Sequence, residues 1–257
     1  MSGANFKDHF SGLAQAYAEA RPEYPDALFD AIVAVVPASA RVWEPGCGSG
    51  QATRGLATRF AHVFATEPSA NQLERHWAQP SSGYTGNVTL AVEPGERTSL
   101  PDGGVELVAV AQALHWFDLE RFFAECRRVL APRGVLAAWG YGDFLAPEGM
   151  VEAVEAFRAQ IDPYWPPERA FVDAHYADFD WPFPALPAPD LWLEEEWRLP
   201  HFLRYLTSMS AVGRCRAETG ADPVARHAPA LADAWGDPDE PRVIQWPLFL
   251  HLRRKPG

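Results

Sequence analysis

The stretch TrpGluProGlyCysGlySerGlyGlnAlaThr, residues 43–53, decides the fold. It begins in the segment ArgValTrpGlu, 41–44, which predicts a short buried strand, and it ends in the run 51–60, which predicts a helix. Between these elements lies a glycine loop: Gly46, Gly48 and Gly50. Glycines accept positive φ angles and let backbone N–H groups approach a ligand closely. A strand, a glycine loop and a helix in this order predict the start of a βαβ unit.

Strands and helices continue to alternate after the loop, and this alternation predicts the fold class. Apolar strands that alternate with helices are typical of a parallel sheet covered on both faces. We therefore predict an α/β fold with a doubly wound, mostly parallel sheet. Strands are expected at 62–66, 88–92, 105–111, 135–139, 191–199 and 243–252. Helices are expected at 5–18, 26–36, 69–78, 119–130, 148–160, 202–209 and 224–235.

A segment rich in proline and aromatic residues, 161–192, interrupts this pattern after the fifth strand. Its prolines preclude long regular elements, and its many aromatic side chains need burial. We favour a cap over the ligand cleft rather than a plain surface excursion. The chain is expected to be one domain with four parts: N-terminal helices (1–36), a cofactor-binding core (37–142), a cap insertion (143–190), and last strands and helices that complete the sheet (191–257).

Composition excludes several function classes. The 257 residues are 47% hydrophobic and 22% charged, which is typical of globular proteins, and no apolar run has the roughly 20 residues of a membrane span. A net charge of −12 without a basic cluster argues against nucleic-acid binding. Three widely spaced cysteines argue against both disulfides and a metal site, and the charged N-terminus lacks a signal sequence. We expect a cytoplasmic monomer or homodimer with a small-molecule substrate and no membrane partner.

The spacing of the glycine loop favours S-adenosylmethionine over NAD. Gly50 follows Gly46 by four positions, whereas a dinucleotide fingerprint places its third glycine five positions after the first, where this chain has Gln51. Glu44 precedes the loop, and a carboxylate suits a cationic amino-acid or sulfonium group better than a diphosphate. Cys47, inside the loop, is interpreted as a small residue that fits rather than a reactive thiol.

Two further acidic residues follow the next strands. Glu67, with Pro68 beside it, comes directly after the second strand, where a carboxylate can accept hydrogen bonds from both hydroxyls of a ribose. Glu96 follows the third strand and could accept from an adenine amino group. A solvated surface charge is the alternative for each. The glycine loop about twenty residues upstream favours the ribose interpretation for Glu67.

The run GlnAlaLeuHisTrpPheAsp, 112–118, ends the fourth strand, on the side of the sheet where ligands bind. Together with the glycine loop, it gives the chain a close resemblance to class I methyltransferases of the type 11 group, in the branch related to trans-aconitate methyltransferases. The resemblance covers nearly the whole chain, including TyrAlaGluAlaArgProGluTyrPro (17–25), ArgValLeuAlaProArgGly (128–134), SerMetSerAlaValGlyArg (208–214) and TrpProLeu (246–248).

The resemblance implies a seven-stranded sheet with an antiparallel last strand and S-adenosylmethionine as the cofactor. It implies cofactor contacts at the positions that match Glu44, Gly46, Glu67, Glu96 and Gln112. It also implies that the N-terminal segment around Tyr17 and Arg21 folds over the cofactor. The chain departs from the family at Glu44, where Asp is commoner, and at Ser49, where Thr is commoner. Both replacements keep the functional group.

Methyl transfer from a sulfonium requires a nucleophile held in line with the methyl carbon. A carboxylate acceptor, one of the candidates, would need only a cationic clamp, for which Arg204, Arg214 and Arg216 are candidates. A hydroxyl, thiol or amine would need a base, and His115 is the candidate; a structural histidine is the equal alternative. Trp116 and Tyr141 are expected to line the substrate pocket. A non-catalytic binder of adenosylmethionine or adenosylhomocysteine is the alternative to an enzyme, and an NAD-dependent oxidoreductase is disfavoured.

Overall fold

A computed structural model describes residues 21–78 and 86–257, and the expected helix 5–18 with Tyr17 lies outside them. The chain forms two compact units, each assembled from separate stretches of sequence. The unit that holds the sheet, called the sheet unit below, comprises 22–146, 167–196 and 243–257. In the second, called the helical unit, the described stretches are Arg21, 147–166 and 197–242.

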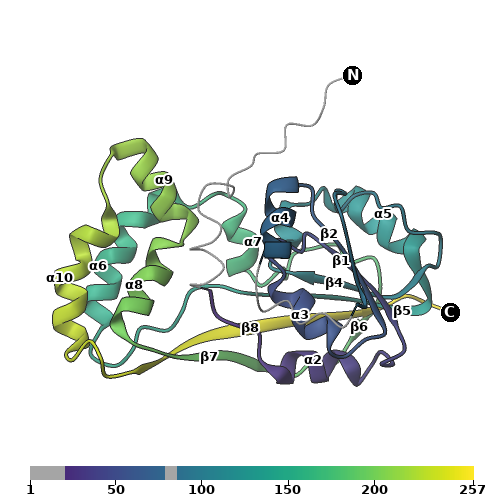
Figure 1. The fold of residues 1–257 in the computed structure, drawn as a ribbon, viewed down its shortest axis with the longest axis horizontal. Coiled ribbons are helices and arrows are strands. Elements are labelled where there is room, and N and C mark those ends of the chain that lie inside the picture. Colours follow the sequence, from purple (N-terminus) through teal and green to yellow (C-terminus); the bar gives the residue numbers. More distant parts are fainter. Residues whose placement is uncertain (1–20, 79–85) are drawn as a thin grey trace. The chain divides into compact units, whose positions relative to one another are not determined.

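The sheet has the strand order β3-β2-β1-β4-β5-β8-β6, with β7 also paired to β8 (Figure 1). Strands β1 to β5 pair in parallel, and β8 pairs antiparallel to β5 and β6. The strands are β1 Arg41–Pro45, β2 His62–Thr66, β3 Val88–Ala91, β4 Val105–Ala111, β5 Leu130–Tyr141, β6 Ala185–Leu186, β7 Leu191–Trp197 and β8 Arg242–Arg254. The predicted α/β class and the antiparallel last strand are confirmed. Within the described residues, 21–78 and 86–257, the sheet has eight strands rather than the seven expected, because a two-residue strand in the proline-rich segment pairs with the long β8.

The sheet unit also contains α2 Asp26–Val33, α3 Gln51–Ala57, α4 Ala70–Ala78, η1 Leu114–Trp116, α5 Leu119–Val129 and α7 Arg169–Asp173. Helices cover both faces of the sheet (Figure 1). Trp43 of β1 and Leu136 of β5 align with the same residue of β4 and therefore share a face, where Phe122 of α5 packs 6.1 Å from Trp43 between ring centroids. Trp139 points to the opposite face and meets Phe29 of α2 at 6.4 Å.

The proline-rich segment places part of its aromatic side chains in the core of the sheet unit, whereas Phe171 and Trp192 are exposed, contrary to the expectation that all of them need burial. Tyr176, Phe179 and Phe183 are buried in this core, and Trp181 packs against them. Burying these rings removes several hundred Å² of apolar surface from water, at roughly 25 cal/mol for each Å². The region 143–190, which we expected to act as a cap, is divided between the two units. Residues 147–166 belong to the helical unit, and 143–146 and 167–190 belong to the sheet unit. Closure of this region over a ligand stays a prediction.

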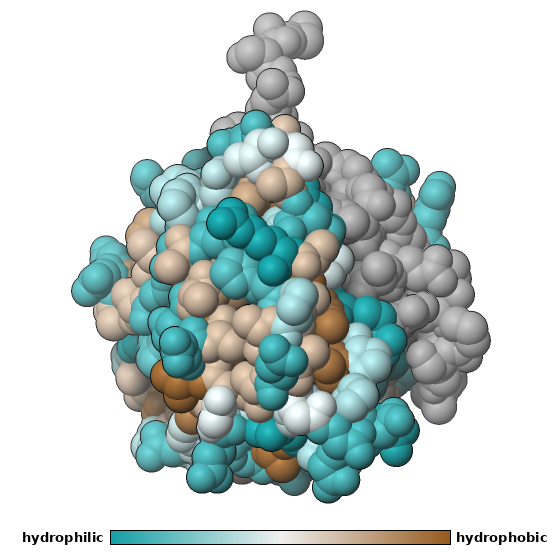
Figure 2. Space-filling view, turned by 90° about the vertical axis from the view of Figure 1, so that its left-hand side faces the viewer, coloured by the Kyte–Doolittle hydropathy of each residue, from teal (hydrophilic) through white to brown (hydrophobic). Residues whose placement is uncertain are grey.

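The helical unit contains α6 Val151–Ile161, η2 Asp162–Tyr164, α8 Leu199–Thr207, α9 Ser210–Thr219 and α10 Pro223–Trp235. Asp222 caps α10 by accepting hydrogen bonds from the backbone N–H groups of the first turn, at 3.0 and 3.2 Å. Phe202 of α8 packs on Trp235 of α10, with ring centroids 5.4 Å apart. On the face of this unit shown in Figure 2, hydrophilic and hydrophobic residues are interspersed.

Candidate functional site

The glycine loop lies at the point where the strand order reverses, between the carboxyl ends of β1 and β4. Gly46 has φ +68°, and a Cβ there would stand 2.9 Å from the Cβ of Ala113, which follows β4. The backbone N–H of Cys47 donates to the Thr66 carbonyl at the end of β2, at 3.0 Å. The loop is thus packed against the ends of two neighbouring strands. The run after β4, which carries His115, is its direct neighbour.

Glu44, the last residue but one of β1, is the most unusual group in the site. Its side chain is 1% exposed, and neither carboxylate oxygen accepts a hydrogen bond from the described part of the chain. Burial raises its pKa to about 8, an effect that the nearby Thr53 hydroxyl and the Arg54 charge only partly oppose. A buried acid that lacks partners is costly in an isolated protein. It fits a site built for a cationic ligand, such as the ammonium group of S-adenosylmethionine.

Glu67 has a different environment from that of Glu44, although it is also buried. Its Oε2 accepts from the N–H of Gly48 and its Oε1 from the N–H of Ser69, both at 3.1 Å. Pro68 lies between these two partners in sequence. Each carboxylate oxygen has two acceptor sites, so Glu67 can hold the glycine loop and still accept from a ligand hydroxyl.

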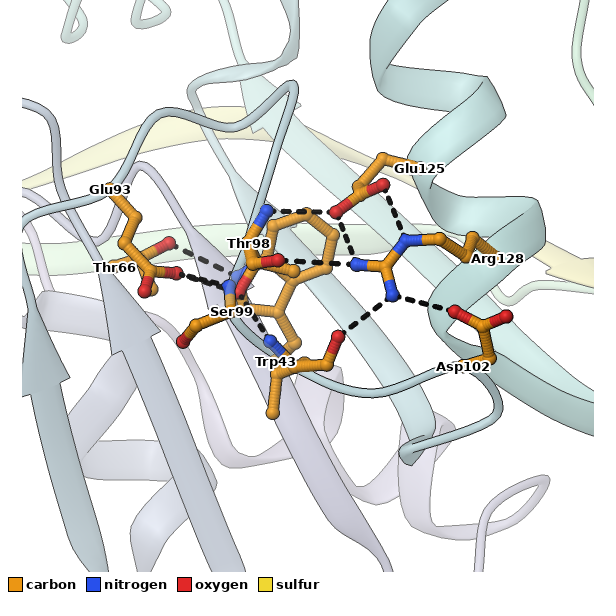
Figure 3. Close-up of polar contacts among 9 residues, drawn as sticks. Trp43, Thr66, Glu93, Thr98, Ser99, Asp102, Glu125 and Arg128 are labelled. Atoms are coloured by element: carbon orange, nitrogen blue, oxygen red, sulfur yellow. Dashed lines mark hydrogen bonds and ion pairs between the residues drawn. The ribbon is translucent and has the colours of Figure 1, made fainter.

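The loop that follows β3 carries Glu96 and is fastened to α5 (Figure 3). Arg128 forms a bidentate pair with Glu125, at 2.5 and 2.9 Å, and also binds the carbonyls of Thr98 and Leu100. Hydrogen bonds with Arg128 lower the pKa of Glu125, which also accepts from the Thr98 N–H at 2.8 Å. Glu96 itself accepts from the N–H of Asp118, at the start of α5, at 2.9 Å. These bonds fix the position of the Glu96 carboxylate.

Gln112, directly after β4, has a positive φ of +53°, which is rare for a residue with a side chain. Its amide Nε2 donates to the carbonyl of Tyr141 at 2.7 Å, and its Oε1 accepts from the N–H of Tyr141 at 2.9 Å. The side chain thereby ties the end of β4 to the end of β5. Tyr141 is buried, and its ring meets those of Tyr24 and Trp246 edge-on at 6.3 Å.

His115 lies on η1, and its Nδ1 is 2.8 Å from the hydroxyl of Tyr176. Burial and, to a smaller extent, the charge of Arg169 lower its pKa to about 4, so the imidazole is neutral at pH 7. Trp116 is 38% exposed, and its ring is tilted against that of His115 with 4.8 Å between centroids. No local sequence pattern marks Tyr176 or Arg169 as a site residue. Both come from the proline-rich segment, where only the tertiary fold shows which residues face the site.

The remaining predicted site residues belong to the helical unit. Arg21 donates to the Ser208 carbonyl at 3.4 Å, and its guanidinium lies 5.4 Å from the centroid of the Tyr205 ring. Arg204 is exposed on α8, and Arg214 is half-buried on α9. Their roles stay predictions, as does that of Tyr17, which lies outside the described residues.

Within residues 21–78 and 86–257, no group of three or more His, Cys, Asp or Glu side chains is arranged to hold a metal ion. All three cysteines lie in this part of the chain, are buried and form no disulfide there; burial and the nearby Glu44 raise the pKa of Cys47. No described helix is both long and apolar enough to cross a membrane.

Comparison with known proteins agrees with this geometry. Residues 43–138 match the family described as the methyltransferase domain. The chain is also similar to a solved structure of a proposed type II methyltransferase from Anaeromyxobacter dehalogenans, with 43% identity over 92% of this chain and 99% of that one, and a TM-score of 0.83. The chain belongs to the class I S-adenosylmethionine-dependent methyltransferases. The predicted cofactor and enzyme class are confirmed, whereas the trans-aconitate branch stays a prediction.

Two curated proteins are further relatives of this methyltransferase. A proposed methyltransferase from Dictyostelium discoideum is 29% identical over 97% of this chain and 96% of its own length. A malonyl acyl-carrier protein O-methyltransferase from Geobacter sulfurreducens is 30% identical over 50% of this chain, and the match spans 48% of that protein. The first relative extends the similarity beyond the cofactor-binding core.

Proposed function

We propose that this methyltransferase transfers the methyl group of S-adenosylmethionine to a carboxylate oxygen of a small molecule. The environment of His115 carries the proposal. This histidine lies in the run whose Ala113 and Phe117 pack against Gly46 of the glycine loop, and its pKa of about 4 makes it a poor base at neutral pH. A hydroxyl or ammonium acceptor would need such a base, whereas a carboxylate is already ionised at pH 7.

The acidic residues of the site account for recognition of the donor. Glu44, buried and without a hydrogen-bond partner among the described residues, would bind the ammonium group of the methionine moiety. Glu67 would accept from the ribose hydroxyls while it holds Gly48. Glu96 would accept from the adenine amino group; the N–H of Asp118 holds its carboxylate, and Arg128 holds the loop that carries it.

We propose that Trp116 and Tyr141 line the pocket for the methyl acceptor. His115 would lie in this pocket, between the glycine loop and the proline-rich segment. When bound, S-adenosylmethionine supplies an electrophilic methyl group on a sulfonium. A lone pair of the acceptor oxygen forms the new C–O bond, the C–S bond breaks, and its electrons return to sulfur. The products are a methyl ester and S-adenosylhomocysteine, and no proton is released. The site therefore has to orient and desolvate the oxygen rather than deprotonate it.

One relative supports an oxygen acceptor. The Geobacter protein is named as a malonyl acyl-carrier protein O-methyltransferase. A malonyl group attached at one end keeps one ionised carboxyl, which makes it an acceptor of the proposed kind. The strongly acidic chain, with a net charge of −12, would disfavour polyanions such as nucleic acids through long-range repulsion. A small carboxylate can be held by local contacts despite this charge.

The test is methyl transfer from S-adenosylmethionine labelled in its methyl group to the metabolites of a cell extract. Methyl esters release their label as volatile methanol in alkali, whereas methyl groups on nitrogen, carbon, sulfur or ether oxygen stay attached. We expect alkali-labile label, with one S-adenosylhomocysteine formed for each methyl transferred. Alkali-stable label would refute the carboxylate acceptor. Binding of S-adenosylmethionine without any transfer would instead favour the non-catalytic binder. Heat-inactivated enzyme and an extract without carboxylic acids serve as controls.

A further inference from the structure

The hydroxyl of Tyr176 determines which nitrogen of His115 carries the proton. Tyr176 is 1% exposed, and its hydroxyl lies 2.8 Å from Nδ1 of His115, while the backbone N–H of His115 also acts on the hydroxyl oxygen as a donor. A buried O–H group must donate to an acceptor, because an unsatisfied donor costs about 1–3 kcal/mol. The acceptor available to it is an unprotonated Nδ1. The hydrogen of the neutral imidazole is then on Nε2.

The phenol keeps its proton in this position. Burial raises the pKa of Tyr176, so the hydroxyl stays a donor across the physiological range. The charged groups nearby are Arg169, Asp143 and Asp173. Arg169 forms ion pairs with Asp143 at 3.3 Å and with Asp173 at 2.7 Å. The charge of Arg169 acts on the His115 ring and favours its neutral form. The His251 ring lies 6.5 Å from that of Tyr176 and donates its Nε2–H to the carbonyl of His175.

The Nε2 atom of His115 faces away from this partner. Within the described chain it makes no hydrogen bond, yet it is not among the buried polar atoms that lack one, so solvent or a ligand can reach it. The adjacent Trp116 is partly exposed beside it. An imidazole with Nε2–H directed to an accessible site can donate a hydrogen bond there, but it cannot take a proton on that nitrogen.

The backbone at Tyr176 also indicates a specific arrangement. His175 and Tyr176 both have positive φ angles, +50° and +55°, and neither is a glycine. Such conformations cost of order 1 kcal/mol or more each and persist where surrounding contacts impose them. The stacking of His175 on Phe249 at 4.9 Å and of Tyr176 on Phe179 at 4.9 Å supplies these contacts. The result aims the Tyr176 hydroxyl at His115.

We propose that Tyr176 is a positioning residue that holds His115 as a hydrogen-bond donor, whose Nε2–H binds the carboxylate of the methyl acceptor. The inference rests on the proposed function and gives His115 a role there. Binding one carboxylate oxygen would orient the other toward the methyl group and leave its lone pair available. The donor would also discriminate against cationic and apolar acceptors, because neither offers an oxygen that can accept this bond.

The first test measures the tautomer directly, without an acceptor. Long-range ¹H–¹⁵N spectra of enzyme labelled in its histidines distinguish Nε2–H from Nδ1–H, and the spectrum of His115→Gln assigns the signal of His115. We expect the Nε2–H form in the wild type, in the presence of S-adenosylhomocysteine, with no titration between pH 6 and 9. In Tyr176→Phe we expect a mixture of both tautomers. An Nδ1–H form in the wild type overturns the inference.

The second test compares two substitutions of His115, with transfer of labelled methyl to the anionic metabolite fraction of an extract as the readout. The glutamine of His115→Gln places an amide N–H near the position of Nε2 but cannot act as a base. We expect it to stay within about tenfold of the wild type, while His115→Ala falls by about 10- to 100-fold, the range for a lost hydrogen bond to a charged group. Tyr176→Phe should fall by about tenfold with unchanged binding of S-adenosylmethionine.

The outcomes separate this inference from the proposed function. Equal loss in His115→Gln and His115→Ala, with alkali-labile product from the wild type, overturns the donor role alone. Alkali-stable product from the wild type overturns the proposed function, and the inference with it, whatever the tautomer. Circular dichroism and binding of S-adenosylhomocysteine establish that each variant is folded before its activity is compared.

Discussion

Replacing Glu44 with glutamine should make the protein more stable and bind its cofactor less well. The Glu44 pKa is about 8 in the folded chain against an ordinary 4.5. At pH 7 the unfolded side chain is ionised, and folding must protonate it. The free-energy cost is the difference between pH 7 and the ordinary pKa multiplied by 2.303RT, about 3 kcal/mol. The amide of glutamine is nearly isosteric with the protonated acid and avoids this cost.

The sign of the effect defines the pH window. Because the folded-state pKa is raised, the contribution of Glu44 to stability is complete below pH 4.5 and is lost as the pH rises to about 8. The stability gained by Glu44→Gln should therefore be absent near pH 4.5 and grow up to pH 8. At pH 7 it corresponds to roughly 6–12 °C in Tm for a chain of this size.

Thermal unfolding between pH 5 and 9 without cofactor measures this difference, and calorimetry measures S-adenosylmethionine binding, which should weaken by about tenfold or more. Glu106→Gln is the matched control. Glu106 pairs with Arg41 at 2.8 Å, and this pairing outweighs burial and lowers its pKa, so its contribution is present at neutral pH and is lost as the pH falls. Its removal should cost about 0.2–1 kcal/mol. A Tm of Glu44→Gln that equals or falls below that of the wild type at pH 8 would refute the reasoning.

Three further predictions concern the cofactor site. Gly46→Ala should weaken S-adenosylmethionine binding at least about tenfold, because its Cβ would meet Ala113 and its φ is positive. Gly220→Ala, also at positive φ but in open space, should lose about 1 kcal/mol of stability and keep its affinity for S-adenosylmethionine. Equal affinities of the two variants would contradict the clash at Gly46. Arg128→Lys should lose about 1–3 kcal/mol of stability and bind S-adenosylmethionine several-fold more weakly, since lysine keeps the charge without the bidentate bonds. The control Arg127→Lys, at an exposed position, should change neither the Tm nor the affinity for S-adenosylmethionine. Binding of S-adenosylmethionine at pH 7 should release close to one proton from Glu44, which calorimetry detects as a dependence of the binding heat on the ionisation enthalpy of the buffer. Glu44→Gln should lack this proton release. A wild type that releases no proton would argue against an ion pair at Glu44.

Local sequence patterns predict the sheet well because each core strand is a short apolar run beside a turn signal. The strands at 62–66 and 105–111 have the expected bounds. The start of β5 differs, since it begins at Leu130 rather than at 135 and continues past Pro132 and Arg133, the latter at φ +64°. Proline and positive φ are signals of a turn, and here they lie in a bulge: Leu130 pairs with Val105 and Val135 with Leu107, while 131–134 have no pairing partner on β4.

Helix α9, Ser210–Thr219, is the clearest omission from the sequence prediction. It buries Ala211, Val212 and Cys215, while Gly213 lies in its interior, so it lacks the strong amphipathic pattern that reveals a surface helix. Helix α8 also begins at Leu199, before the expected 202, because Pro200 suits a first turn. These elements depend on packing within the helical unit more than on local propensity.

The candidate site likewise contains residues that local sequence patterns could reveal and residues that they could not. Residues at strand ends, such as Glu44 and Glu67, could be found from their spacing to the glycine loop. Tyr176 could not, because it lies more than sixty residues from His115 in a segment without periodicity, at a backbone conformation that no local pattern indicates. Spacing also could not show that both polar atoms of the Gln112 side chain bind the backbone of Tyr141.

The double use of Glu67 constrains how this site could change in evolution. The same carboxylate that is proposed to bind the ribose also holds the N–H groups of Gly48 and Ser69. A substitution there would alter the loop even before any ligand arrives, so cofactor preference and loop conformation cannot drift independently. A lineage that shifted to another nucleotide would first need a second residue to hold the loop. Glu44 holds no backbone group among the described residues, so a change of cofactor preference could begin more easily there than at Glu67.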